Sequence, residues 1–347
     1  MRNRLAITCG DPAGVGPEIV AAWLAANPAE AQEVALVGPA RWLDSLPEAA
    51  EKIPVGLPEF EATPGRPDGE GSLVAWAALE QAAEGCRAGS FAGVVTGPVS
   101  KGRLASIGWQ FPGQTEFFAA RWGGNPVMAF CGGRLRVVLL TWHIPLRAVG
   151  AELNLENFTR AICAADELVR ADEFVAVPPG WNDPGMAPSA GMRVSGGEPA
   201  RPAGKPVRIG VCGLNPHAGE EGLIGREEVE TINPILDSLR PRFPGLSRAE
   251  PGDTLFARQL RGEFDVAVAL YHDQGLAPLK TVDFDESVNV TLNLPFVRTS
   301  PDHGTAFSIA GRGRANARSF ANAVAVARRL LHFRAGSGYL KPPASLL

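Results

Sequence analysis

Short apolar runs alternate with helix-spaced apolar positions along most of the 347 residues. Apolar runs of four to eight residues bounded by turn residues are typical of buried strands, and apolar residues three or four apart are typical of helices. Runs of the first kind predict strands at 4–8, 34–38, 91–96, 126–130, 135–141, 207–213 and 264–271. Spacing of the second kind predicts helices at 17–26, 72–86, 155–170, 226–240 and 315–334. This alternation predicts an α/β fold, and "CGGRL" between two strands predicts a hairpin and mixed sheets.

One segment departs from this pattern. Residues 177–206 are dense in proline, glycine and alanine and have no period. A structureless stretch of this length is uncommon within a compact domain, so we expect a surface excursion.

Composition narrows the class of protein. The length predicts about two domains, and 33 Lys+Arg against 37 Asp+Glu gives a net charge of −4, without the basic excess of a nucleic-acid binder. The sequence has no apolar run long enough to predict a membrane span, and its first apolar stretch is too short for a signal peptide. We therefore expect a soluble, cytoplasmic protein. The five cysteines are scattered and odd in number, which predicts reduced thiols.

Three of the five histidines follow apolar strands: His143 in "TWHIPL", His217 in "GLNPHAGEEG" and His272 in "LYHDQGLAPLK". In open α/β sheets, ligands bind at the carboxyl ends of the strands. An imidazole there can bind a metal, carry a proton or fill a polar niche, and a single histidine decides nothing.

Two glycine-containing turns are weaker candidates. "CGDPAGVGPEI" follows a strand and precedes a helix, so Gly10, Asp11 and Gly14 could contact a nucleotide cofactor. Their spacing differs from G-x-G-x-x-G, and a tight strand-to-helix turn explains them equally well. "TGPVSK" at 96–101 could likewise hold a phosphate or make a turn.

Long motifs along the chain carry a family resemblance. They are "ITCGDPAGVGPEI", "TGPVSKGRL", "GQTEFFA", "TWHIPL", "GLNPHAGEEGLIGREE", "YHDQGLAPLK" and "VNVTLNLPFVRTSPDHGTAFSIAGRG". In this order they resemble the PdxA-like 4-hydroxythreonine-4-phosphate dehydrogenase family of pyridoxine and pyridoxal phosphate biosynthesis. The resemblance implies a two-domain fold like that of isocitrate and isopropylmalate dehydrogenases, with a cleft between the domains and a homodimer that completes each active site. We expect one α/β domain at 1–130 plus 300–347, the possible nucleotide side, and a second at 131–299 with the metal ligands and the dimer interface.

The resemblance also implies a metal centre. His143, His217 and His272 match the family's ligands for one divalent ion, which could be zinc, cobalt, manganese or magnesium. It further implies that His143 and His217 belong to one subunit and His272 to its partner. Three neutral imidazoles leave a coordination position open for substrate, as in catalytic metal sites.

Further positions match the family's substrate-binding residues. Among them, Lys280 offers a point charge, Asn289 a neutral donor and Arg298 a planar fork. This mixture is suited to binding a phosphomonoester. Thr115 also matches, but "GQTEF" has Gln114 where the family usually has histidine, so an ionisable ring is replaced by a neutral amide.

Three more positions concern the metal ligands and the pocket. Asp253 and Asp273 match acidic family positions that could orient the ligand histidines, although Asp253 could equally cap a helix. Trp142 stands before His143 where a small residue is usual, and it could narrow the pocket.

The implied reaction is NAD(P)-dependent oxidation of 4-phosphooxy-L-threonine to a 3-oxo acid, which decarboxylates to 3-amino-2-oxopropyl phosphate. No side chain accepts a hydride, so the chemistry itself requires NAD or NADP. A paralogous dehydrogenase of threonate or erythronate phosphate is an alternative. More remote alternatives are a three-histidine metal hydrolase and a metal-dependent binding protein without turnover.

Overall fold

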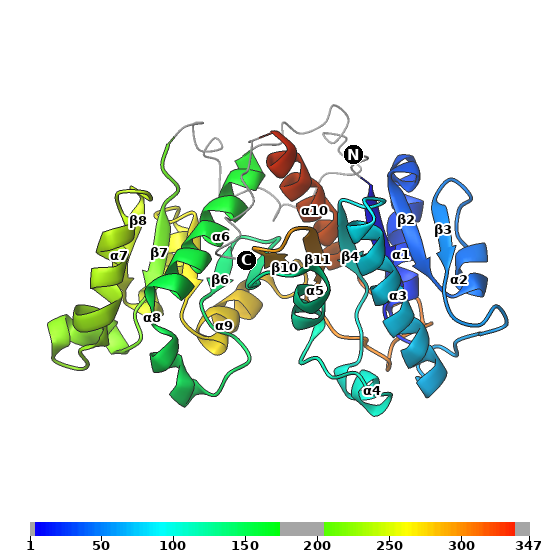
Figure 1. Ribbon diagram of the computed structural model, residues 1–347, viewed down its shortest axis with the longest axis horizontal. Helices are drawn as coiled ribbons and strands as arrows, with labels where there is room; N and C mark the ends of the chain where they lie inside the picture. Colours follow the sequence, from blue (N-terminus) through cyan, green and yellow to red (C-terminus); the bar gives the residue numbers. More distant parts are fainter. Residues whose placement is uncertain (1–3, 174–204, 337–347) are drawn as a thin grey trace. The chain divides into compact units, whose positions relative to one another are not determined.

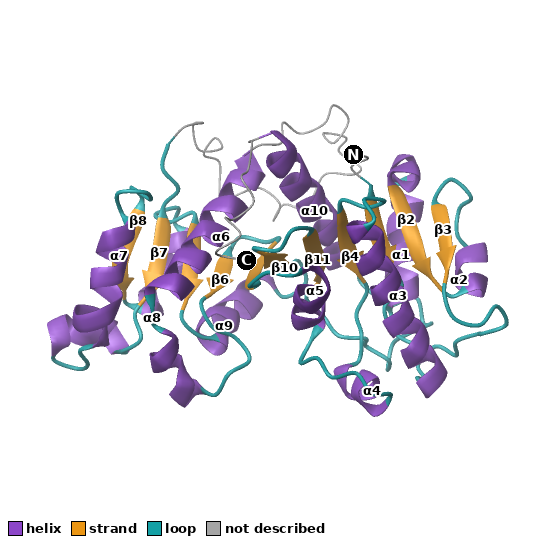
Figure 2. Ribbon diagram, viewed as in Figure 1, coloured by secondary structure: helices purple, strands orange, loops and turns teal. Residues whose placement is uncertain are grey.

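The computed structural model describes residues 4–173 and 205–336 (Figure 1). All but the last two residues of the proline- and glycine-rich excursion at 177–206 lie outside the described residues. Strands and helices alternate through most of the described chain, and each group of strands is accompanied by helices (Figure 2). The predicted α/β class is therefore confirmed.

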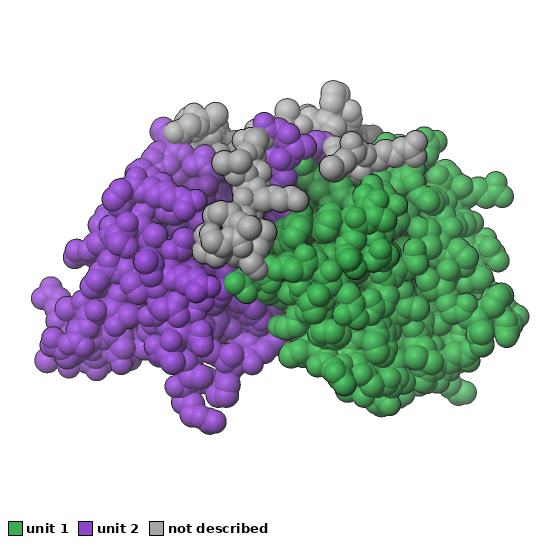
Figure 3. All heavy atoms as spheres, in the orientation of Figure 1, with its two compact units in different colours: residues 1–126, 288–331, 340–347 green, residues 127–287, 332–339 purple. Residues whose placement is uncertain are grey.

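The chain divides into two compact units (Figure 3). Unit 1 contains Met1–Pro126, Val288–Leu331 and Leu340–Leu347, and unit 2 contains Val127–Ser287 and His332–Tyr339. The first boundary lies close to the predicted one. The second differs, because the segment from Val288 belongs to unit 1 and not to the second domain.

Strand pairing explains this second boundary. In unit 1 the strand order is β3-β2-β1-β4-β11-β10. The strands are β1 (Leu5–Thr8), β2 (Val34–Gly38), β3 (Glu51–Pro54), β4 (Gly93–Thr96), β10 (Val288–Leu292) and β11 (Val297–Pro301). β11 pairs in parallel with β4 and carries β10 as its antiparallel neighbour, so two strands from late in the chain complete the sheet of unit 1.

Unit 2 has the strand order β5-β6-β9-β7-β8. The strands are β5 (Val127–Cys131), β6 (Val137–Leu139), β7 (Ile209–Cys212), β8 (Leu246–Glu250) and β9 (Val266–Ala269). β5 and β6 form the predicted antiparallel hairpin, whereas β6, β9, β7 and β8 are parallel. Both units thus have mixed sheets, as predicted.

The helices connect these strands. In order they are α1 (Gly16–Ala26), η1 (Pro28–Glu33), α2 (Ala40–Asp44), α3 (Gly69–Arg87), α4 (Lys101–Ser106), α5 (Gln114–Trp122), η2 (Leu146–Glu152), α6 (Leu155–Glu173), η3 (Pro216–Gly222), η4 (Glu228–Ile232), α7 (Asn233–Leu239), α8 (Gly252–Leu260), α9 (His272–Asp283) and α10 (Arg318–Gly336). All five predicted helices are present. Among the described residues, no helix combines the length and the apolar character needed to cross a membrane.

α9 is the most consequential element that the apolar pattern missed. His272 was expected only to follow a strand, but it is the first residue of this helix, which contains both Gly275 and Pro278. A Cβ at Gly275 would lie 2.7 Å from Val137 Cγ1 and 2.9 Å from Leu139 Cδ2 of β6. The glycine therefore serves close packing of α9 on the sheet, and tertiary contacts override its low helix propensity.

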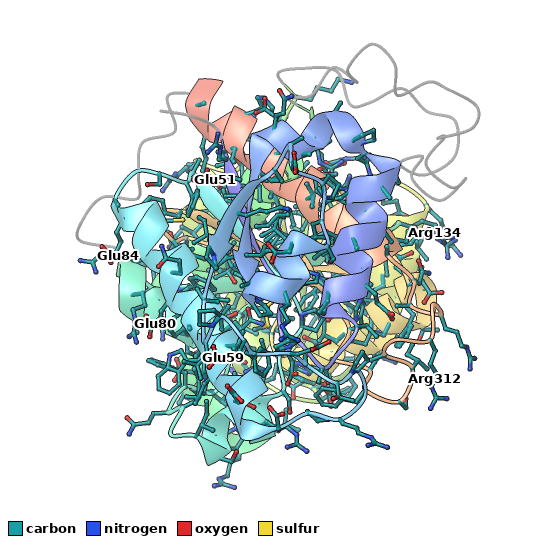
Figure 4. The ribbon with its side chains drawn as sticks, turned by 90° about the vertical axis from the view of Figure 1, so that its right-hand side faces the viewer. Glu51, Glu59, Glu80, Glu84, Arg134 and Arg312 are labelled. Atoms are coloured by element: carbon teal, nitrogen blue, oxygen red, sulfur yellow. The ribbon has the colours of Figure 1, made fainter. Side chains whose placement is uncertain are left out.

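In unit 1 an ion pair joins α3 to α5, the helix that begins at Gln114. Arg121 Nε donates to Glu80 Oε2 at 2.7 Å, and Figure 4 labels Glu80 with its neighbour Glu84 on α3. Phe117 and Phe118 on the same helix are fully buried. These contacts fix α5 and hence the position of Gln114.

Candidate functional site

The three predicted metal-binding histidines follow three adjacent parallel strands of unit 2. His143 comes four residues after β6, His272 three residues after β9 and His217 five residues after β7. β9 pairs in parallel with both β6 and β7. All three segments therefore start from the carboxyl edge of one sheet, where α/β proteins bind ligands.

His143 and His272 are neighbours within one chain. Thr141 Oγ1 donates to the Leu270 carbonyl at 2.7 Å, which continues the pairing of β6 and β9 past the strand ends. The two imidazole centroids are 5.7 Å apart. Metal–nitrogen bonds of about 2.0–2.1 Å place the centroids of two rings on one zinc ion roughly 5–6 Å apart. This distance suits two ligands of one ion within one chain, which differs from the expected placement of His143 and His272 in different subunits. The subunit assignment of the ligands stays a prediction.

Carboxylates orient two of the three rings. His272 Nδ1 lies 2.7 Å from Asp273 Oδ1, and His217 Nδ1 lies 2.8 Å from Glu220 Oε1. A ring whose Nδ1–H donates to a carboxylate keeps its Nε2 lone pair for a metal. The orienting role of Asp273 stays a prediction that this contact supports, and Glu220 is a residue that the sequence analysis missed.

The backbone around His217 is strained. His217, Ala218, Gly219, Glu220 and Glu221 all have φ between 45° and 81°. Left-handed backbone costs non-glycine residues roughly 1–2 kcal/mol each, so such residues normally occur singly. Consecutive ones persist only where surrounding contacts hold them, and they concentrate at functional sites.

His217 does not complete a three-ligand group within one chain. Throughout residues 4–173 and 205–336, no three His, Cys, Asp or Glu side chains are grouped so that they could hold a metal ion. Within one described chain, the ring contact between predicted ligands is therefore that of His143 with His272.

Three other predicted residues of unit 2 have clear positions. Asp253 lies in the first turn of α8, but the N-cap is Pro251 and no side chain caps this helix, so the capping alternative is wrong. Lys280 lies eight residues beyond His272 on α9, about 12 Å along the axis, with Nζ 5.8 Å from the Phe284 ring centroid. Trp142 packs against the buried core of unit 2, which accounts for its large ring.

Unit 1 brings the other four predicted substrate-binding residues together around Arg298. This arginine on β11 is only 3% exposed. Its Nη2 donates to Gln114 Oε1 at 3.1 Å and to Thr96 Oγ1 at 3.0 Å, and its Nη1 donates to Asn289 Oδ1 at 3.3 Å and Thr291 Oγ1 at 3.4 Å. Thr96 and Thr291 were not predicted. We use the name arginine cluster for Arg298 and its four hydrogen-bond partners, Thr96, Gln114, Asn289 and Thr291.

All the hydrogen-bond acceptors that the described chain gives Arg298 are neutral oxygens. Burial lowers the pKa of Arg298 to about 10, against the opposing effect of the Glu116 carboxylate. The buried Nε has no hydrogen-bond partner among the described residues. A buried cation without a directly bonded anion is costly, so the arrangement suits an incoming anion such as phosphate.

Gln114 and Thr115 adjoin this arginine at the start of α5. Gln114 uses both ends of its amide, since Nε2 donates to the Gly97 carbonyl at 3.4 Å while Oε1 accepts from Arg298. Thr115 Oγ1 lies 3.4 Å from Thr291 Oγ1. The substitution of glutamine for the family's usual histidine therefore supplies an acceptor to the arginine.

The glycine-rich turn of unit 1 has a packing explanation. Gly10 has φ +72°, and a Cβ there would lie 2.4 Å from the Pro98 carbonyl oxygen; a Cβ at Gly14 would lie 2.8 Å from that of Thr305. Asp11 is buried, and burial raises the pKa of its carboxyl group. A cofactor-binding role for Gly10, Asp11 and Gly14 stays a prediction.

Comparison with known proteins identifies the family. The family model described as pyridoxal phosphate biosynthetic protein PdxA matches residues 10–181 and 202–327. The 4-hydroxythreonine-4-phosphate dehydrogenase of Zymomonas mobilis is 38% identical, covering 95% of this chain and 96% of its own length.

Solved structures agree. A crystal structure of 4-hydroxythreonine-4-phosphate dehydrogenase from Klebsiella pneumoniae has a TM-score of 0.71 at 31% identity, covering 95% of this chain and 99% of the other. A terephthalate 1,2-cis-dihydrodiol dehydrogenase from Burkholderia xenovorans has a TM-score of 0.63 at 25% identity, covering 94% and 97%. The resemblance seen in the motifs is confirmed, and the chain belongs to the PdxA family of pyridoxal phosphate biosynthetic proteins.

Proposed function

We propose that this protein catalyses the NAD(P)-dependent, divalent-metal-assisted oxidation of 4-phosphooxy-L-threonine to the 3-oxo acid, which decarboxylates to 3-amino-2-oxopropyl phosphate. The proposal depends most on the His143–His272 pair, whose centroids are 5.7 Å apart at the carboxyl edge of the sheet in unit 2. Family membership supplies the reaction class, because the relatives reported above are named as dehydrogenases of this substrate.

The donor set favours particular metals. Three neutral imidazole nitrogens suit zinc, cobalt or manganese better than magnesium, which prefers oxygen ligands. The ion would supply a Lewis acid to the alcohol oxygen, and a nicotinamide would accept the hydride. In this proposal His143, His217 and His272 hold the ion, Asp273 and Glu220 fix the Nδ1–H tautomer of their histidines, and Asp253 acts as a further orienting residue.

The arginine cluster would bind the phosphate of the substrate. Arg298 presents a buried fork, and Asn289, Gln114 and Thr115 fix its surroundings. Lys280 on α9 of unit 2 is a further proposed substrate-binding residue, which offers a point charge. These groups hold the substrate by its non-reacting end, so that its alcohol carbon is oriented for oxidation.

We also propose a homodimer in which His143 and His272 of one subunit share a metal ion with His217 of the partner. Exposed large apolar side chains support this arrangement, since seven of the nine in the described chain belong to unit 2. Ile144 and Leu146 follow His143, while Leu223, 87% exposed, and Ile224 follow His217. Large apolar side chains that are exposed in one chain are candidates for burial in a protein interface.

Gln114 favours one alternative substrate. A neutral amide already bonded to Arg298 and Gly97 cannot supply the charge or the proton transfer of a histidine. A paralogous enzyme acting on threonate or erythronate phosphate would keep the metal site and the phosphate site. Its substrate would lack the amino group of 4-phosphooxy-L-threonine. The dihydrodiol dehydrogenase relative illustrates that one scaffold serves different substrates.

An assay of the purified protein with both substrates and both nicotinamides tests the proposal. We expect zinc-dependent reduction of NAD or NADP with 4-phosphooxy-L-threonine and a lower kcat/KM with the sugar-acid phosphates. Faster turnover of the sugar-acid phosphates would establish the alternative. Substrate turnover without reduction of a nicotinamide would instead indicate a hydrolase. The cytoplasmic location stays a prediction.

A further inference from the structure

A buried carboxylate stands behind the loop that carries His217. Glu228, the first residue of η4, is only 1% exposed. Its Oε1 accepts from the backbone N–H of Leu214 at 2.7 Å and of Asn215 at 2.8 Å, and its Oε2 accepts from Asn215 Nδ2 at 2.9 Å. One side chain thus satisfies three donors of the segment that leads from β7 to His217.

The loop is also shaped around this carboxylate. A Cβ at Gly219 would lie 2.6 Å from Glu228 Oε2, and a Cβ at Gly213 would lie 3.1 Å from Oε1. Gly219 belongs to the left-handed segment that begins at His217. Glu228 therefore contacts the loop both before and within its strained part.

We propose that Glu228 is a positioning residue that holds the left-handed turn and so presents His217 Nε2 to the metal ion. This inference rests on the proposed metal function of His217. Glu228 does not touch the ion's ligand atoms; it acts through the backbone of Leu214 and the side chain of Asn215. A carboxylate suits this role because it offers two acceptor oxygens, whereas an amide would place its own donors against Asn215 Nδ2.

The adjacent Glu227 provides a matched control. It carries the same charge and also accepts from Asn215 Nδ2, at 2.7 Å, but it is exposed and bonds to neither backbone N–H of the loop. Both variants lose one charge near the loop, but only Glu228→Gln alters the buried contacts. A difference between the two variants therefore reports the effect of these contacts.

The test measures Zn²⁺ affinity of the full-length protein by competition with a chromophoric chelator. We expect Glu228→Gln to weaken Zn²⁺ binding about tenfold or more, as for other residues that orient metal ligands. Glu227→Gln should stay within about twofold of the unsubstituted protein, as is usual for surface changes. In metal-free protein, hydrogen exchange at the Leu214 and Asn215 amides should accelerate in Glu228→Gln and remain slow in Glu227→Gln.

Zn²⁺ binding by folded Glu228→Gln at the unsubstituted level would overturn the inference. If that variant does not fold, rapid exchange of the Leu214 and Asn215 amides in the unsubstituted protein would overturn it equally. His217→Ala distinguishes failure of the proposed function: unchanged Zn²⁺ affinity in this variant means that His217 is not a ligand, while slow exchange at the two amides shows that Glu228 still holds the loop.

Discussion

The arginine cluster of unit 1 and the histidines of unit 2 differ in how deeply their polar groups are buried. Arg298 is 3% exposed and bonded on several sides by neutral oxygens. The His217 side chain is 60% exposed, and its ring is oriented by one carboxylate of its own loop. The proposed anion site thus lies inside one unit, whereas the proposed metal ligand His217 stands at the surface.

This contrast in burial indicates where each proposed site obtains its specificity. A buried guanidinium has lost its water and gains most from an anion that replaces it. Two imidazoles bind an ion weakly until a third ligand joins, so in the proposed homodimer the partner subunit would control metal binding. The two sites should therefore respond independently to substitution.

Removal of a metal ligand should have the largest effect. We expect His272→Ala, or chelation of the unsubstituted enzyme, to lower kcat by about 10³-fold or more, because several kcal/mol of transition-state stabilisation are lost. Zn²⁺, Co²⁺ or Mn²⁺ should restore the chelated enzyme but not the variant. Binding of inorganic phosphate, measured by calorimetry, should be unchanged in His272→Ala. Full activity in a metal-free preparation would contradict the metal centre.

Substitution of the buried arginine should come next. Arg298→Met should raise KM for the phosphorylated substrate about 100-fold, the usual cost of removing one partner of a buried, hydrogen-bonded ion pair. Arg298→Lys should have a KM between those of Arg298→Met and the unsubstituted enzyme, because a lysine keeps the charge but cannot supply the planar fork. Zn²⁺ affinity should stay at the unsubstituted value in both variants; a parallel loss of Zn²⁺ would show that the two sites are not independent.

A carboxylate beside Arg298 should have a smaller effect. Gln114→Glu keeps the acceptor that Arg298 uses at 3.1 Å but adds a negative charge. This charge would compete with phosphate, so KM should rise about tenfold. Thr115→Val provides a control at the next position that removes a hydroxyl without adding charge. Unchanged KM in Gln114→Glu would mean that the substrate's anion does not bind at this arginine.

The ion pair between α3 and α5 should contribute least. The hydrogen bond from Arg121 lowers the pKa of Glu80, so its stabilising effect is present above the unfolded pKa and is lost as the pH falls through the lower folded value. Both side chains are partly exposed, so Glu80→Gln should cost at most about 1 kcal/mol in urea unfolding at pH 7. The difference in the free energy of unfolding between Glu80→Gln and the unsubstituted protein should vanish in acid. Glu84→Gln, in a more exposed pair with Arg87, is the control, and an equal cost there would remove the special role of Glu80.

Local pattern predicted much of the fold but not its long-range pairings. The apolar runs predicted most central strands, whereas β10 and β11 were missed because Asn289 and Arg298 interrupt them with polar side chains. Those same side chains form the arginine cluster, which exists only because β11 pairs with β4. α9 was missed because Gly275 weakens the helical pattern that the sheet then stabilises.

The candidate site shows the same limit. Motifs identified His143, His217 and His272, but not that His143 and His272 are neighbours, which follows from pairing of β6 with β9. Glu228 and the left-handed turn were also beyond prediction, because propensities disfavour consecutive positive φ at non-glycine residues. Contacts distant in sequence hold that turn.

Subunit mixing tests most directly the claim that each metal ion is shared. His143→Ala and His217→Ala homodimers, each inactive, are unfolded together and refolded, with differential tags to confirm heterodimers. In a two-fold heterodimer one site collects both lesions and the other is intact, so random pairing should restore roughly a quarter of the activity. Mixing His143→Ala with His272→Ala should restore none, because both ligands come from one chain. Recovery of activity in the second mixture, or no recovery in the first despite heterodimers, would contradict the proposed shared site.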